Sequence, residues 1–124
     1  MKDIEGLKKR KLYDISLNGT NLAVYQVDGK MVKKAGHMDF VEGGHDLVYK
    51  FIPANEIWID DLVDPDERDF VVIHEASEWL LMKYGKKKYD PAHVIANKIE
   101  LRFRRGNPRK PRKILKAVSM SKSR

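Results

Sequence analysis

Apolar and polar residues alternate along the first part of the chain in a way that predicts short β-strands. Weak alternation predicts a strand over Lys11–Leu17, and an apolar, β-branched run predicts another over Leu22–Val27. Asn18-Gly19, which separates these two segments, is a strong tight-turn signal. Asp28-Gly29 is a second turn signal and is followed by Met31-Val32, so the three segments together predict a small antiparallel meander.

Two more strands are predicted before the pattern changes. Gly43-Gly44 indicates a break in the chain, and the alternation after it predicts a strand over Asp46–Ile52. Glu56–Asp60 predicts a short strand with its two isoleucines on one face and its tryptophan on the other. Together with the meander, these strands form the predicted N-terminal sheet.

The second part of the chain has helical patterns with clear start and stop signals. Asp64-Pro65-Asp66-Glu67 places an N-cap, a proline and a glutamate where a helix begins, and that helix is predicted to end near Tyr84, before Gly85. Asp90-Pro91 repeats the start signal for a second helix that should end near Arg105. The predicted fold class is therefore α+β, a small, mostly antiparallel N-terminal sheet packed on two C-terminal helices.

The first helix is unusual because it combines an apolar composition with three ionisable groups. From Phe70 to Met82 it has nine apolar and four polar residues and no lysine or arginine, so it is predicted to be buried on most sides. At about 100° per residue, His74, Glu75 and Glu78 fall in one sector of the helix. Ionisable groups on one wall of a buried helix are unfavourable unless they pair, bind a metal or line a cleft.

The spacing of these groups is that of a hydrolytic metal site. His74 and Glu78 lie one turn apart and can reach the same ion, while Glu75 lies beside them and can hold a proton. His93, near the start of the second helix, supplies a third ligand, because the helix dipole there favours the neutral imidazole. The alternative is an i,i+4 hydrogen-bonded pair of His74 and Glu78, with Glu75 on a solvated face.

Composition limits the class of protein and the kind of site. The 124 residues have the length of one domain, predicted over residues 1–105. The absence of cysteine excludes disulfides and a cysteine nucleophile, so any metal must be held by His, Asp or Glu. There is no apolar run near the roughly 18 residues of a membrane span and no apolar signal segment, which predicts a cytoplasmic protein without a membrane anchor.

The net charge of +7 is concentrated at the C-terminus. Residues 102–124 carry ten Lys/Arg and no acid, and residues 106–124 are predicted to be a basic, disordered tail. Such a tail predicts non-specific, salt-dependent binding to nucleic acid through residues 102–124. A solubilising end is the alternative interpretation.

Four segments of the chain match a known pattern. They are Glu56–Asp60, His74–Glu78, Leu81–Gly85 and Tyr89–Glu100. Residues 56–100 as a whole resemble the zincin-like metallopeptidases and, more narrowly, small uncharacterised phage and prokaryotic proteins that share a Tyr-x-x-Ala-His-x-x-Ala-Asn-x-x-Glu segment.

This resemblance implies a small sheet packed on the metal-binding helix, with Glu56–Asp60 beside that helix and an edge strand able to pair with a peptide. It also implies Zn²⁺ on His74, Glu78 and His93, with Glu75 activating a bound water. The implied function is a zinc-dependent hydrolase, a minimal metallopeptidase acting on a peptide or protein.

Glu78 departs from most zincins, which have a second histidine there. An anionic ligand lowers the positive charge at the metal and leaves bound water less acidic. Two alternatives to an enzyme therefore stay open. One is a non-catalytic scaffold stabilised by metal, and the other is a nucleic-acid-associated accessory protein that acts through its tail.

Several other residues have two interpretations each. Glu100 is predicted to pair with Arg104 at i+4 rather than to bind metal. The remaining candidates are Asp60 and Asp61 as caps or imidazole partners, His37 and His45 as exposed loop residues or neighbours of the site, Tyr84 and Tyr89 as packing or oxyanion contacts, and Trp58 and Trp79 as core residues.

Overall fold

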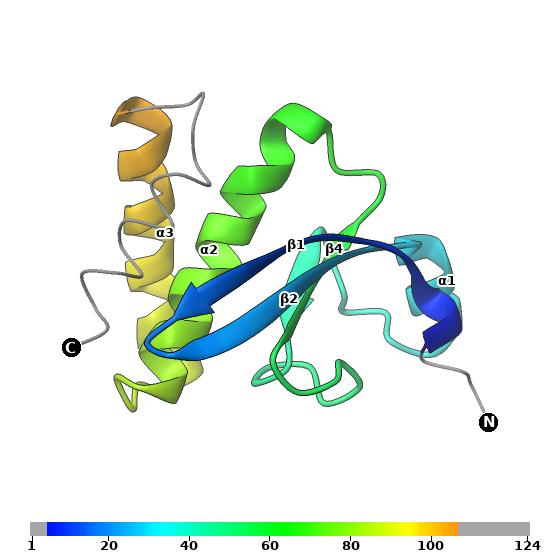
Figure 1. Cartoon of the computed structure of the whole chain (residues 1–124), viewed down its shortest axis with the longest axis horizontal. Coiled ribbons are helices and arrows are strands. Elements are labelled where there is room, and N and C mark those ends of the chain that lie inside the picture. The colour runs from blue at the N-terminus through cyan, green and yellow to red at the C-terminus, as the bar shows by residue number, and fades with distance from the viewer. Residues whose placement is uncertain (1–4, 107–124) are drawn as a thin grey trace.

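The computed structural model describes residues 5–106, which form a four-stranded sheet and three α-helices (Figure 1). The predicted α+β class is confirmed. In chain order the elements are the 3₁₀ turn η1 (Glu5–Leu7), β1 (Lys8–Leu17), β2 (Thr20–Val27), α1 (Gly29–Lys34), β3 (Gly43–His45), β4 (Glu56–Asp60), α2 (Pro65–Lys83) and α3 (Tyr89–Gly106).

The sheet has the strand order β1-β2-β4-β3 and is mixed. β1 and β2 form the predicted antiparallel hairpin, and its turn residues Asn18 and Gly19 have positive φ angles of 50° and 84°. β4 pairs in parallel with β2 and antiparallel with β3. β4 therefore has a neighbour on each side, and it lies beside α2 as expected, while the sheet edge near α2 is formed by β3.

The predicted third strand of the meander, at Met31-Val32, is wrong. These residues belong to the short helix α1, because the side chain of Asp28 accepts a hydrogen bond from the Met31 N–H at 3.2 Å and caps the helix. Val32 is fully buried in this helix. An Asp-Gly pair can begin either a tight hairpin or a capped helix, and burial of Val32 is compatible with both.

The predicted strand over Asp46–Ile52 is also wrong, because the chain turns there. The N–H groups of Val48 and Tyr49 donate to the carbonyl of His45 at 3.3 and 3.0 Å. The predicted break at Gly43-Gly44 instead forms strand β3. Glycine is required here by close packing, since a Cβ atom on Gly44 would overlap the ring of Tyr49.

β4 separates two cores, as its alternating sequence predicts. Ile57 and Ile59 pack toward α2, whereas Trp58 faces a second cluster on the other side of the sheet, and Trp58 is fully buried. The core under α2 also includes Trp79, so both tryptophans are core residues as predicted. The second cluster consists of Leu7, Val27, Val32, Phe40, Ile52 and Trp58.

Both long helices form where the sequence predicts them. The side chain of Asp64 accepts a hydrogen bond from the Asp66 N–H at 3.4 Å and caps α2, which ends one residue before Tyr84. α3 lies beside α2 (Figure 1) and packs on it through Ala92 and Ala96, which are fully buried. The predicted basic tail lies outside the described residues, apart from its first residue, which ends α3.

Within residues 5–106, no helix combines the length and the apolar character needed to cross a membrane. The predicted cytoplasmic location stays a prediction.

Candidate metal centre

A cleft with a volume of about 570 Å³ lies along α2. Its walls come from α2, α3, the segment around β3 and the loop between β4 and α2. The four predicted site residues, His74, Glu75, Glu78 and His93, all line this cleft. A cavity of this size falls in the range of small-ligand and active sites in proteins.

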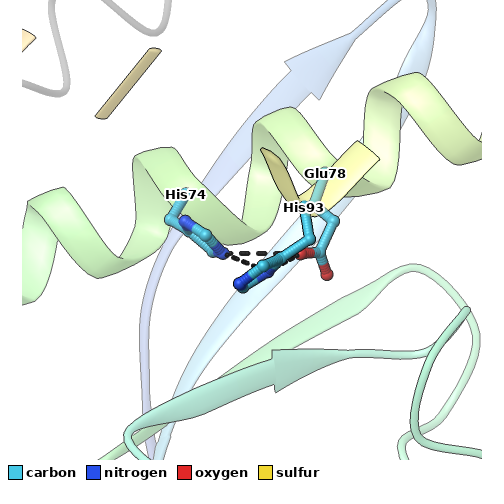
Figure 2. Close-up of side chains that lie close together, drawn as sticks. All are labelled: His74, Glu78 and His93. Carbon is cyan, nitrogen blue, oxygen red and sulfur yellow. Dashed lines mark hydrogen bonds and ion pairs between the residues drawn. The ribbon is translucent and has the colours of Figure 1, made fainter. Parts of the chain in front are cut away.

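The structure brings the three predicted ligands together (Figure 2). His74 and Glu78 project from successive turns of α2, and His93 reaches them from the first turns of α3. His93 Nδ1 lies 2.8 Å from Glu78 Oε2, His74 Nε2 lies 3.4 Å from the same oxygen, and the two nitrogens lie 3.2 Å apart. This cluster could hold a metal ion.

The separations of these three atoms match the requirements of a tetrahedral ion. Ligand atoms at about 2.0–2.1 Å from a tetrahedral Zn²⁺ lie roughly 3.3 Å from one another. The observed separations of 3.2 and 3.4 Å are within a tenth of an ångström or so of this value, and the 2.8 Å separation is shorter because a hydrogen bond joins the two atoms. If His93 Nδ1 and Glu78 Oε2 moved apart by about half an ångström, all three separations would match those of a tetrahedral site.

His74 is oriented by a carboxylate behind it. Its Nδ1 lies 3.2 Å from Glu100 Oε1, at ion-pair distance, although the direction falls outside that of a hydrogen bond. A carboxylate only accepts protons, so the proton of a neutral His74 belongs on Nδ1 and its lone pair on Nε2, which faces the cluster. The predicted pairing of Glu100 with Arg104 is confirmed at 2.9 Å, but its contact with His74 was not predicted.

Glu78 is oriented by a third histidine, His45, which lies 33 residues earlier in the chain. His45 is fully buried, and its Nε2 lies 2.8 Å from Glu78 Oε1. Its Nδ1 accepts a hydrogen bond from the Leu47 N–H at 3.2 Å. These two contacts imply that Nε2 carries the proton and donates it to Glu78, which leaves Glu78 Oε2 facing the cluster.

A second group of potential ligands, His45, Glu75 and Glu78, lies next to the first. An imidazole nitrogen that carries a proton has no lone pair for a metal ion. His45 would have to break its bond with Leu47 to ligate through Nε2. We therefore interpret His45 as a positioning residue for Glu78, and of the two groups it is His74, Glu78 and His93 whose free lone pairs could hold a metal ion.

Glu75 lies beside the three ligands, half-buried in the cleft wall. Burial raises the pKa of its carboxyl group, and the negative charge on Glu78 adds to this effect, so that the pKa is raised to about 7. Its predicted role as the catalytic carboxylate stays a prediction.

The contacts within the cluster also determine its charges. Burial alone would lower the pKa of His74, but the carboxylates of Glu100 and Glu78 outweigh this effect and raise the pKa to about 10. Burial alone would raise the pKa of Glu78, but hydrogen bonds from the three surrounding histidines lower it to about 2. Because His74 is protonated at neutral pH, a metal ion binding there would displace a proton.

The secondary candidates divide between the site and the rest of the fold. The Tyr89 ring stacks on His93 with centroids 5.3 Å apart, and its hydroxyl lies 3.4 Å from His93 Nδ1, so Tyr89 belongs to the site. Tyr84 instead contacts Thr20 and Trp79. His37 stacks on the ring of Phe51, away from the cluster.

Asp60 and Asp61 do not contact the cluster histidines. Asp60 accepts hydrogen bonds from the N–H groups of Gly29 and Leu62 at 3.3 and 3.1 Å, which confirms its predicted role in a turn. Asp61 pairs with Lys9 at 2.7 Å.

Comparison with known proteins adds no assignment. No protein-family model, curated protein sequence or solved structure matches this chain. The zincin resemblance therefore stays a prediction, and any functional argument depends on the geometry of the site.

Proposed function

We propose that this protein is a metal-dependent hydrolase, and most simply a minimal metallopeptidase. The observation that carries the proposal is the convergence of His74 Nε2, His93 Nδ1 and Glu78 Oε2 within 3.4 Å of one another in a cleft. Structural metal sites are closed by four protein ligands, whereas catalytic zinc sites have three and leave one position open. Three ligands beside a cleft correspond to the catalytic arrangement.

The ligand set favours zinc over the other common divalent ions. Two imidazole nitrogens and one carboxylate oxygen form a known type of zinc site. Mg²⁺ and Ca²⁺ instead prefer sites made of oxygen ligands. Zinc therefore fits the donors of His74, Glu78 and His93 best.

The chemistry divides between the metal and Glu75. When bound, Zn²⁺ polarises the attacking water and lowers its pKa. Glu75 would take a proton from the water while the water oxygen attacks the amide carbon, and would then give that proton to the leaving amine nitrogen as the C–N bond breaks. Glu75 ends in its starting state, so the net reaction consumes one water for each peptide bond.

A non-catalytic scaffold is the second candidate, and the packing of the cluster supports it. Glu78 accepts hydrogen bonds from His45 in β3 and from His93 in α3, so the cluster joins three elements of the fold. In this case His74→Ala would lower thermal stability while the wild-type protein, loaded with zinc, would cut no peptide.

Nucleic-acid binding through residues 102–124 stays a prediction for the tail. A metal-dependent nuclease would combine the metal cluster with the basic tail, but the cleft does not favour it, because seven carboxylates and a single arginine line it. Such a lining repels the phosphate backbone of a nucleic acid.

The test of the proposed function is the Glu75→Gln variant. With one equivalent of zinc, the wild-type protein should cleave members of a fluorogenic peptide library. Glu75→Gln should keep the zinc and lose at least about 100-fold in rate, since general acid–base catalysis contributes 10²- to 10⁴-fold. Asp66→Asn, an exposed carboxylate on the same helix outside the cleft, is the matched control and should cleave at the wild-type rate.

Cleavage by Glu75→Gln at the wild-type rate would contradict the role of Glu75. Stoichiometric zinc without any cleavage by the wild-type protein would favour the scaffold.

A further inference from the structure

The cleft carries a strong local excess of negative charge, although the whole chain has a net charge of +7. Seven carboxylates line it, and the basic side chains that face them are the guanidinium of Arg104 and the imidazoles of His74 and His93. Even with a divalent ion bound, the lining stays negative. A cleft lined by charges of one sign concentrates ligands of the opposite sign. The lining carboxylates are Glu42, Asp60, Asp64, Glu67, Glu75, Glu78 and Glu100.

These carboxylates are not equally neutralised. Glu67 and Glu100 share the guanidinium of Arg104, at 2.8 and 2.9 Å. Asp60 and Asp64 accept hydrogen bonds from backbone N–H groups, which orient a carboxylate but leave its charge in place. Glu75 and Glu78 lie at the metal cluster, and the carbonyl of Glu42 accepts a hydrogen bond from the Asp60 N–H at 2.8 Å, which places Glu42 beside the end of β4. The exposed carboxylates away from the cluster and without a cationic partner are therefore those of Glu42 and Asp64, in the segments before α2.

A second, independent feature of the cleft is its exposed apolar surface. Val41 and Leu62 line it and remain 62% and 75% exposed, which leaves two large aliphatic side chains in water beside the acidic end. Large apolar side chains that are exposed in the wall of a cleft favour a ligand whose own apolar groups bury them on binding. A small cation such as a polyamine would not need this surface, whereas a peptide with apolar side chains would bury it.

The distance along α2 places the charge relative to the metal cluster. Asp64 precedes His74 by ten residues, which corresponds to roughly 15 Å along the helix axis. An extended peptide advances about 3.3 Å per residue. A side chain bound at the acidic end would therefore lie about four residues from the peptide bond at the metal cluster.

From these observations we infer that the cleft binds an extended cationic peptide. Its Lys or Arg side chain pairs with the carboxylates of Asp64 and Glu42 about four residues from the bond to be cut, and neighbouring apolar side chains cover Val41 and Leu62. This inference rests on the proposed function for the position of the cut bond, but charge recognition by the cleft can be measured without catalysis.

The experiment is a binding titration of the full-length Glu75→Gln variant, with and without one equivalent of zinc. Three fluorescein-labelled decapeptides share the same apolar residues and carry Lys, Gln or Glu at the variable positions, and fluorescence anisotropy reports binding. The Lys peptide should bind at least about tenfold tighter than the Gln peptide at low salt, and raising the salt should remove most of this difference.

Two double substitutions distinguish binding in the cleft from binding elsewhere on the protein surface. Adding Glu42→Gln and Asp64→Asn should weaken binding of the Lys peptide about 3- to 10-fold, since each exposed ion pair contributes modestly. Asparagine keeps the helix cap at position 64. The matched control adds Asp14→Asn and Asp66→Asn, which remove two charges outside the cleft and should change binding less than about twofold.

Each outcome decides the inference. Equal binding of the three peptides, or equal loss in the cleft and control variants, would overturn it. Displacement of the Lys peptide by spermidine at an equal concentration would assign a small cation instead of a peptide. Cleavage by the wild-type protein is measured separately. Tight, charge-dependent binding without cleavage would refute the proposed peptidase and support charge recognition by the cleft. Cleavage without any preference for the Lys peptide would support the peptidase and refute charge recognition.

Discussion

His45 offers the sharpest prediction about the cluster, because it is interpreted as a residue that acts through Glu78 rather than on the metal. His45→Met keeps a side chain of similar length but removes the Nε2–H that lies 2.8 Å from Glu78 Oε1. His45→Gln keeps an amide N–H that can replace it. The first variant should lose metal affinity, and the second should retain it.

The size of the effect follows from the contact that is lost. A hydrogen bond to a charged group contributes about 1.5–3 kcal/mol, and Glu78 is buried, so water cannot replace the donor. At about 1.4 kcal/mol for each factor of ten, the affinity for Zn²⁺ should fall about 10- to 100-fold. His45→Gln should stay within about threefold of the wild-type protein.

The assay is a zinc titration in competition with a chromophoric chelator, with thermal melting to establish that each variant is folded. The wild-type protein should take up one equivalent of zinc. Wild-type affinity in folded His45→Met would refute the orienting role. Uptake of two equivalents by the wild-type protein, with one lost in His45→Met, would show instead that His45 ligates a second ion.

Three other outcomes follow from the structure. Glu100→Gln removes the negative charge 3.2 Å from His74 Nδ1 and should lower zinc affinity about tenfold in the same titration, without changing the one-to-one stoichiometry. Gly44→Ala places a Cβ atom into a neighbouring tyrosine ring and should lower the free energy of unfolding, measured in urea, by about 1–3 kcal/mol. Gly106→Ala, where a Cβ meets open space at the end of α3, should not lower it, and equal losses in the two variants would contradict the packing of β3. In chelator-treated protein, the raised pKa of His74 stabilises the fold fully below about pH 6.5, and this contribution is lost as the pH rises through about 10. The lowered pKa of Glu78 stabilises the fold above about pH 4.5, and this contribution is lost as the pH falls toward about 2. The free energy of unfolding, measured at a series of pH values, should show both losses.

The parts of the fold that the sequence predicts well depend on local signals. α2 begins at Pro65 because the side chain of Asp64, just before it, caps the helix, and His74 and Glu78 share a face because helical geometry requires it. The strand Glu56–Asp60 is likewise predicted to the residue, since alternation alone determines which side chains face each core.

The parts that the sequence does not predict depend on contacts between distant segments. His45 reaches Glu78 only because β3 forms at the sheet edge, and two consecutive glycines are as typical of a break as of a closely packed strand. The contact between Glu100 and His74 requires the packing of α3 against α2. The residue pattern within one helix does not predict the distance between side chains on two different helices. The positioning residues of the site are therefore less predictable than its ligands.

The most direct test of the central claim is the metal content of the untagged, full-length protein, measured by mass spectrometry. His74→Ala and His93→Ala are measured in parallel, and His37→Ala, which removes a histidine stacked on Phe51 away from the cluster, is the control. The wild-type protein and His37→Ala should carry about one zinc per chain, and the other two variants should carry none. Absence of zinc from the wild-type protein even after zinc is added back, or its retention in both cluster variants, would show that His74, Glu78 and His93 do not form a zinc site.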